Sequence, residues 1–169
     1  MRIDERRQTM KHQPVVLTSI VPADADTIWT KLTKLSTLQH IASPYATFKP
    51  VDGSVDLNWQ PGAVYRFRFR LFGLLPLGIH TIRVQRFDRA DSIVYTEESN
   101  PYVPVWNHTI RLERIDSGHT RYTDEVEIGA GWKTPFVCLW AKLFYAHRQR
   151  KWVRLLEAAS KQAKGKDGE

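Results

Sequence analysis

The chain of 169 residues is long enough for one domain with a substantial core, and 42% of its residues are hydrophobic. No apolar run reaches the roughly 18 residues of a membrane span, and the charged N-terminus lacks the apolar core of an export signal. The net charge of +7 permits contact with nucleic acid or an anionic membrane but requires neither, because much of the excess lies near the two ends. The single cysteine, Cys138, cannot form a disulfide within the chain. A fold without disulfides suits a reducing compartment, so we expect a cytoplasmic protein.

The first elements in chain order are a strand and two short helices. The β-branched run Val15 to Val21 predicts the strand. Pro22 and the acidic residues that follow it are typical of a helix N-terminus. A second short helix is expected from Ser36 to Ile41, because Ser43-Pro44 would end it.

A series of strands follows without an intervening helix. The pattern predicts strands at Tyr45 to Val51, Val64 to Leu71, Ile79 to Phe87, Ser92 to Ser99, Val103 to Ile115 and Thr120 to Ile128. In the second of these, aromatic residues alternate with Arg66, Arg68 and Arg70, which indicates one buried and one solvated face. Because the aromatic residues lie opposite the arginines, nucleic-acid binding is disfavoured.

The last long element, Lys133 to Lys161, has no helix breaker after Pro135 and predicts a helix of roughly 25 residues. Two rows of side chains recur at three- and four-residue spacing: Phe136, Trp140, Leu143 and His147, and beside them Val137, Ala141, Phe144, Arg148, Trp152, Leu155 and Ala159. After His147 the apolar arc narrows, so Arg148, Arg150, Lys151 and Arg154 are expected at the surface. A helix this aromatic needs a large partner surface, which the strands can supply.

The order of elements predicts a single α+β domain, in which about six antiparallel strands pack against the long C-terminal helix. No repeat or linker divides the chain. We expect a flexible N-terminal arm over residues 1–13, the domain over 14–162 and a flexible tail over 163–169.

The loops between the strands differ in character at the two ends of the expected sheet. If successive strands form hairpins, alternate loops lie at the same end. One end then collects polar turns, and the other collects the apolar loops 72–78, 100–104 and 129–136. These loops could line the mouth of a cavity through Leu74, Leu75, Leu77, Tyr102 and Trp132. They could equally pack on each other as a hydrophobic plug, and the sequence leaves both interpretations open.

Several motifs, in this order and spacing, resemble the START and polyketide-cyclase (SRPBCC) superfamily. They are the opening Val21-Pro-Ala-Asp-Ala-Asp26, then Trp106-Asn-His108, Gly118-His-Thr120 and Thr123-Asp124, and the final Phe144-Tyr-Ala-His-Arg148. The resemblance covers about Val15 to Leu156. It implies a helix-grip fold, a curved antiparallel sheet of about six to seven strands wrapped around the long helix with a cavity between them. Members bind lipids, sterols, quinones or polyketides, and some catalyse cyclisation or dehydration.

Strand alternation gives a candidate site without reference to the family. His108 and Asp124 fall on the apolar side of two neighbouring strands. Asp124 could orient His108 as a general acid or base, the pair could recognise a polar group of a ligand, or it could be a structural pair satisfied within the core. Glu97 shares its alternation with Ile93 and Tyr95, so we expect it to point inward and pair with an arginine or histidine.

The remaining expected contacts complete a cavity wall. The wall is predicted to consist of Tyr65, Phe67, Phe69, Ile82, Trp106, His108, Ile110, Tyr122, Asp124, Trp140, Phe144 and His147. His147 could instead lie at the helix edge beside the arginines. The spacing of histidines and glycines matches no metal or phosphate motif, so neither a metal nor a cofactor is expected.

The sequence thus predicts a carrier or sensor of a small hydrophobic molecule, such as a lipid, sterol, quinone or polyketide. A cyclase- or dehydratase-like enzyme that uses His108 and Asp124 is the first alternative, and a protein that contacts the membrane surface is the second. The oligomeric state stays open.

Overall fold

The computed structural model describes residues 11–53 and 59–166, with side chains described as far as residue 161. The elements are β1 (Gln13–Val21), α2 (Ala25–Leu32), α3 (Leu35–Ala42), β2 (Ala46–Pro50), β3 (Val64–Leu71), β4 (Leu75–Asp88), β5 (Ile93–Ser99), β6 (Val105–Arg114), β7 (Thr120–Gly129), the 3-10 turn η1 (Gly131–Lys133) and α4 (Thr134–Lys166). Each predicted strand and helix is present, and most ends differ by one or two residues. Among the described residues, no helix combines the length and apolar character needed to cross a membrane.

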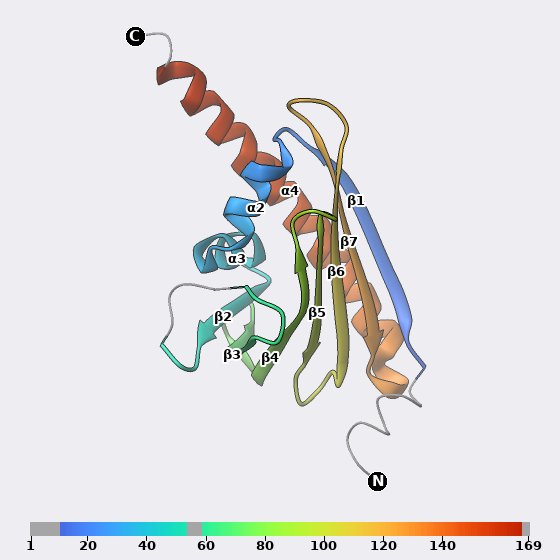
Figure 1. Ribbon diagram of the computed structural model, residues 1–169. Helices are drawn as coiled ribbons and strands as arrows, with labels where there is room; N and C mark the ends of the chain where they lie inside the picture. The colour runs from blue at the N-terminus through green and yellow to red at the C-terminus, as the bar shows by residue number, and fades with distance from the viewer. Residues whose placement is uncertain (1–10, 54–58, 167–169) are drawn as a thin grey trace.

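The strands form one antiparallel sheet in the order β1-β7-β6-β5-β4-β3-β2. The first strand pairs with the last, from Gln13 opposite Ile128 to Val21 opposite Thr120. Figure 1 shows that the sheet curves around α4, and that α2 and α3 lie above β2 in this view, next to α4. The predicted arrangement, a curved sheet that grips a long C-terminal helix, is confirmed.

The two short helices begin as their sequence indicates. The Asp24 carboxylate caps α2 by accepting a hydrogen bond of 2.8 Å from the backbone N–H of Thr27. Ile28 and Trp29 of the same helix are buried, and the Trp29 ring meets Phe87 of β4 edge-on. These contacts attach α2 to the concave side of the sheet.

The two rows of α4 have different surroundings. Ala141, Phe144 and Trp152 are buried beneath the sheet, whereas Phe136 and Leu143 of the other row are 69% and 56% exposed. Arg148 was expected at the surface, and this expectation is wrong, because only 6% of it is exposed. It lies on the buried row, where helical spacing places it between Phe144 and Trp152.

The described elements extend slightly beyond the expected domain, residues 14–162. β1 begins at Gln13, and α4 continues to Lys166, past residue 162 where the domain was expected to end. The rest of the expected arm and tail, residues 1–10 and 167–169, lies outside the described residues, as does Ser54 of the turn after β2.

Candidate ligand-binding cavity

A cavity of about 680 Å³ lies between the sheet and α4. Within the described part of the chain, α4 packs mainly on β1, β7 and α3, and much less on β3 to β6. The curvature of the sheet therefore leaves space between its central strands and the helix. The walls are mostly aliphatic and aromatic, with a few polar groups, and both this character and the volume are typical of small-molecule sites.

Seven of the twelve residues predicted for the wall line this cavity. They are Phe69, Ile82, Trp106, His108, Ile110, Trp140 and Phe144. Among the others, Phe67 and Tyr122 are buried in the surrounding packing, Tyr65 contacts Trp59 near the start of β3, and Asp124 lies behind His108.

His147 does not lie on the cavity wall. Its Nε2 donates a hydrogen bond of 2.7 Å to the carbonyl of Ser43, and its ring packs against Tyr45. Of the two positions considered from the sequence, His147 thus takes the one at the helix edge, where it connects α4 to the end of α3.

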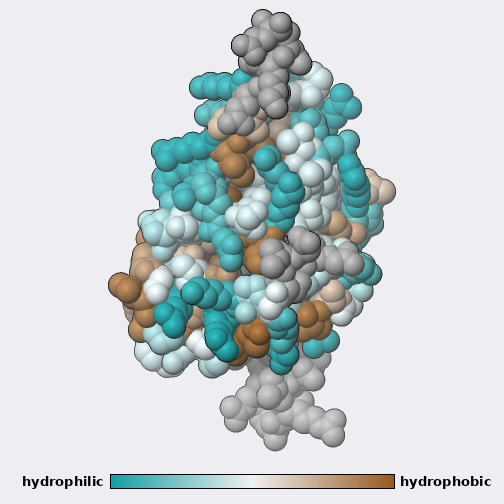
Figure 2. All heavy atoms as spheres, turned by 90° about the vertical axis from the view of Figure 1, so that its left-hand side faces the viewer, coloured by the Kyte–Doolittle hydropathy of each residue, from teal (hydrophilic) through white to brown (hydrophobic). Residues whose placement is uncertain are grey.

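The apolar loops meet at the lower end of Figure 1, where β5 turns into β6 and α4 begins. Leu77, Tyr102 and Trp132 line the cavity, whereas Leu74 and Leu75 do not. Leu74 and Trp132 are 83% and 82% exposed, so these side chains do not close the core as a plug. Figure 2 shows hydrophobic side chains reaching the surface mainly in the lower half of its face.

A glycine brings two of these loops together. Gly78 has a φ of +81°, which favours glycine, and an added Cβ would lie 3.2 Å from Cγ of Pro101. The start of β4 can therefore approach the β5–β6 loop closely.

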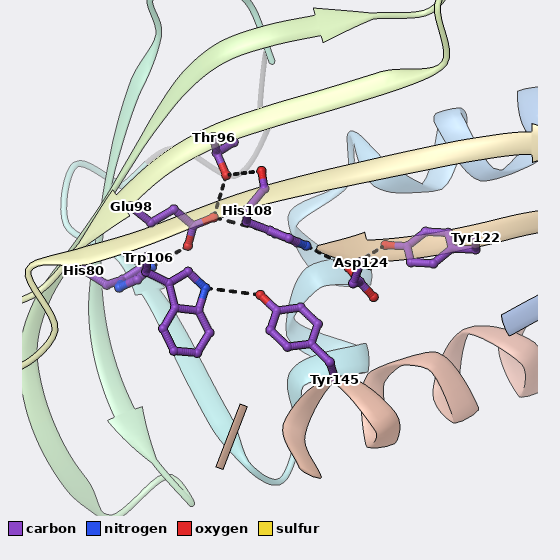
Figure 3. A network of polar contacts seen from close by, with 8 residues as sticks. All are labelled: His80, Thr96, Glu98, Trp106, His108, Tyr122, Asp124 and Tyr145. Carbon is purple, nitrogen blue, oxygen red and sulfur yellow. Dashed lines mark hydrogen bonds and ion pairs between the residues drawn. The ribbon is translucent and has the colours of Figure 1, made fainter. Parts of the chain in front are cut away.

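His108 and Asp124 form a buried pair at the inner wall (Figure 3). The register of β6 and β7 places Asp124 opposite Ile110, one step along the same face from His108. His108 Nε2 donates a hydrogen bond of 2.7 Å to Asp124 Oδ1, and Gln149 Nε2 donates one of 3.1 Å to Oδ2. Burial raises the pKa of Asp124, but the hydrogen bond from His108 and the charge of Arg148 outweigh it and hold this pKa below its ordinary value.

A second carboxylate, Glu98, continues the polar cluster across the sheet (Figure 3). Its Oε2 accepts a hydrogen bond of 2.7 Å from His80 Nε2, and its Oε1 accepts one of 2.7 Å from the Thr96 hydroxyl. His108 Nδ1 lies 3.8 Å from the same Oε1 atom. Burial raises the pKa of Glu98, yet the hydrogen bond and charge of His80, with that of His108, lower it below its ordinary value.

The inward acidic residue of β5 is therefore Glu98, and the expectation for Glu97 is wrong. Both alternating sets of this strand contain good strand formers, so its own sequence does not choose between them. The pairing with β6 determines which set points inward, because Thr96 lies directly opposite His108 and opposite residues share a face. An inward His108 thus implies an inward Thr96 and, two residues later, Glu98.

Arg148 adds a positive charge to the cavity wall near this cluster. Its guanidinium carbon lies 4.9 Å from the centre of the Tyr145 ring and 5.6 Å from that of Phe144. Burial lowers the pKa of Arg148, but the negative charge of Asp124 more than compensates and raises it. The side chain is therefore a permanent cation inside a largely apolar cavity.

Tyr145 supports this part of the wall. Its hydroxyl accepts a hydrogen bond of 3.2 Å from Trp106 Nε1, and burial raises the pKa of this hydroxyl, so it stays protonated. The wall predicted from the sequence did not include Tyr145, His80 or Glu98. In the structure His80 is buried on the same face of β4 as Ile82 and Val84.

The model of a family described as "Domain of unknown function (DUF8410)" matches residues 19–156. A search of curated proteins finds no match.

Several solved structures are similar over most of their length. The Zhui aromatase/cyclase from Streptomyces sp. R1128 has a TM-score of 0.65 and 18% identity, over 87% of this chain and 94% of that one. Norcoclaurine synthase from Thalictrum flavum, in complex with dopamine and hydroxybenzaldehyde, has a TM-score of 0.65 and 13% identity, over 91% of each chain. A START superfamily protein from Mycobacterium smegmatis has a TM-score of 0.64 and 14% identity, over 88% and 99%. At these identities the likeness shows the fold, which is that of the START and polyketide-cyclase proteins.

Proposed function

The chain belongs to the DUF8410 family, and we propose that it binds a small hydrophobic molecule in the cavity between the sheet and α4. The observation that carries this proposal is the cavity of about 680 Å³, whose wall is mostly apolar and includes one cluster of buried polar side chains. Structural neighbours described as an aromatase/cyclase and as a synthase holding two small aromatic compounds support the same class of ligand.

Two kinds of side chain on the wall would contribute to binding in different ways. Trp106, Trp140 and Phe144 offer flat apolar surface, and each Å² of apolar ligand surface removed from water contributes about 25 cal/mol. The polar cluster on one side of the cavity would fix the orientation of the ligand, because its buried groups favour a ligand that supplies a polar partner.

Native mass spectrometry of freshly purified protein tests this proposal. We expect a co-purified small molecule, or a rise in melting temperature with at least one member of a panel of sterols, quinones, fatty acids and aromatic polyketides. A protein that carries no molecule and whose melting temperature none of these compounds changes would contradict the proposal.

A cyclase- or dehydratase-like activity is the second candidate, and the geometry of His108 favours it. Because Nε2 donates to Asp124, a neutral imidazole would have its lone pair on Nδ1, which has Glu98 Oε1 at 3.8 Å and no closer hydrogen-bond partner among the described residues. Once a ligand is known, His108→Ala discriminates the two functions. An enzyme loses turnover while it retains the ligand, whereas a carrier changes only in affinity.

Contact with a membrane surface would serve either function, because a hydrophobic ligand partitions into lipid. Leu74 and Trp132 are the most exposed of the large hydrophobic residues described, and Trp132 also lines the cavity. We therefore include in the proposal that this end of the sheet is the mouth of the cavity and meets the lipid.

A further inference from the structure

Arg148 lacks the partner that a buried arginine normally has. Within the described part of the chain, the ion pairs of the cavity join His80 to Glu98 and His108 to Glu98 and Asp124, and none includes Arg148. Its Nε is fully enclosed without any hydrogen-bond partner. A buried charge that lacks a directly bonded counter-ion costs several kcal/mol of stability, so its retention points to an occupant that supplies the missing partner.

The guanidinium of Arg148 is enclosed by aromatic rings but remains accessible from the cavity. The rings of Tyr145 and Phe144 pack against it at 4.9 and 5.6 Å, and their cation–π attraction satisfies none of its five N–H donors. Of the three nitrogens of Arg148, Nε alone is both fully enclosed and without a hydrogen-bond partner. The two terminal nitrogens therefore keep some accessible surface, and the side chain to which they belong lines the cavity.

The nearby carboxylates are already bonded elsewhere. Asp124 accepts from His108 and Gln149, and Glu98 accepts from His80 and Thr96. They raise the pKa of Arg148 through space without forming an ion pair with it. The negative charge of the cluster is thus directed toward the histidines, and the terminal N–H groups of Arg148 remain for a ligand.

We propose that the ligand is an amphipathic acid whose carboxylate binds the terminal nitrogens of Arg148, an inference that rests on the proposed function. A carboxylate matches the planar fork of a guanidinium with two parallel hydrogen bonds. Phe136, near the expected mouth, precedes Arg148 by twelve residues of one helix, which is roughly 18 Å at 1.5 Å per residue. Val137, Trp140 and Phe144 line that length, so the acid enters head first and its apolar body lies along α4.

Two matched pairs of probes test this inference by calorimetry: dodecanoic acid against 1-dodecanol, and 2-naphthoic acid against 2-naphthamide. The acid of at least one pair should bind at least tenfold more tightly than its neutral partner. Arg148→Gln should weaken binding of that acid by about 10- to 100-fold, since hydrogen bonds to charged groups contribute about 1.5–3 kcal/mol. Binding of the neutral partner should change only a few-fold. Arg150→Gln removes the same charge from an exposed position of α4 and should change neither.

The outcomes separate this inference from the function on which it rests. Neutral probes that bind the natural protein as tightly as the acids overturn the inference and leave the cavity a hydrophobic site. Equal loss of acid and neutral binding in Arg148→Gln also overturns it. If that variant fails to fold, Arg148→Lys replaces it, since lysine keeps the charge but lacks the planar guanidinium. Arg148→Lys must then weaken binding of the acid without weakening binding of its neutral partner. Failure of all four probes to bind overturns the inference, whereas the proposed function fails only if the sterols, quinones and polyketides of the wider panel also leave the melting temperature unchanged.

Discussion

At the scale of single residues, the buried pair of His108 and Asp124 gives the inner wall its polarity. Replacing His108 by Ala leaves the Asp124 carboxylate buried without its shortest hydrogen bond. We expect the free energy of unfolding to fall by about 3 kcal/mol, because a buried charge that loses its partner keeps its desolvation cost. Urea titration measures this change.

The neighbouring Thr109 provides the control, since its side chain alternates to the other face of β6. Thr109→Ala should change the free energy of unfolding by no more than about 0.5 kcal/mol. A His108→Ala variant as stable as Thr109→Ala would contradict the account of the pair.

Acid should destabilise the protein through the same residues. The pKa values of Asp124 and Glu98 lie below their ordinary 3.8 and 4.5, so the stabilisation they provide is complete above those ordinary values. This stabilisation is lost as the pH falls below about 4.5 and approaches the lower pKa values that the two carboxylates have in the folded protein. Urea titrations between pH 6 and pH 3 should show this loss, and it should be shallower in Asp124→Asn. Asp52→Asn, an exposed change in the turn after β2, should behave as the natural protein does, and equal slopes in all three proteins would contradict the assignment.

The sequence predicts the face of a side chain correctly where the alternation within its own strand is sufficient. It fails where that face depends on the register with a neighbouring strand. The alternation of β6 and β7 brought His108 and Asp124 together. The position of Glu98 depends on the β5–β6 register, which the sequence of β5 does not contain. Arg148 was assigned to the surface because arginine usually lies there, although its row already indicated burial.

At the scale of elements, α4 buries one row of side chains beneath the sheet, whereas its opposite side carries exposed residues such as Leu139 and Leu143. Trp152 of the buried row is fully buried, and Leu139, from the exposed side of the same helix, is not. Trp152→Ala should lower the free energy of unfolding by about 3–5 kcal/mol, because a large core side chain leaves a cavity. Leu139→Ala should change it by at most about 0.5 kcal/mol, and thermal and urea unfolding measure both. Similar losses in the two variants would contradict this orientation of α4.

The strands were predicted well where their alternation is strict and less well where proline and glycine occur. β3 begins and ends as expected, at Val64 and Leu71. β4 begins at Leu75, four residues earlier than predicted, because Pro76 and Gly78 are typical of a loop. Both lie beside an irregularity in the pairing with β3, where a strand can accommodate them.

At the scale of the whole molecule, the cavity depends on properties that the sequence does not display. Its volume follows from the curvature of the sheet and from the distance between α4 and the central strands. The sequence indicated the aromatic wall and the apolar end, but it left a mouth and a plug as equal alternatives. The exposure of Leu74 and Trp132 shows that they do not form a plug.

The apolar end of the sheet gives a prediction about membranes. Flotation with anionic liposomes should recover the natural protein with the lipid, and the double change Leu74→Asp and Trp132→Asp should reduce that recovery at least tenfold, because each adds a charge where lipid contact is expected. Ile20→Asp alters an exposed hydrophobic residue of β1 and serves as the control. Recovery that Ile20→Asp reduces equally, or that the double change leaves intact, would contradict the proposed docking.

Binding of a neutral fluorescent probe shows whether the space between the sheet and α4 admits a hydrophobic ligand. Fluorescence titration with N-phenyl-1-naphthylamine should show saturable binding of one molecule per chain. Val137→Trp, which adds volume at the cavity wall, should abolish binding, whereas Val153→Trp, elsewhere on α4, should not. Binding that Val137→Trp leaves unchanged, or no saturable binding in the natural protein, would contradict the proposed binding of a hydrophobic molecule in this cavity.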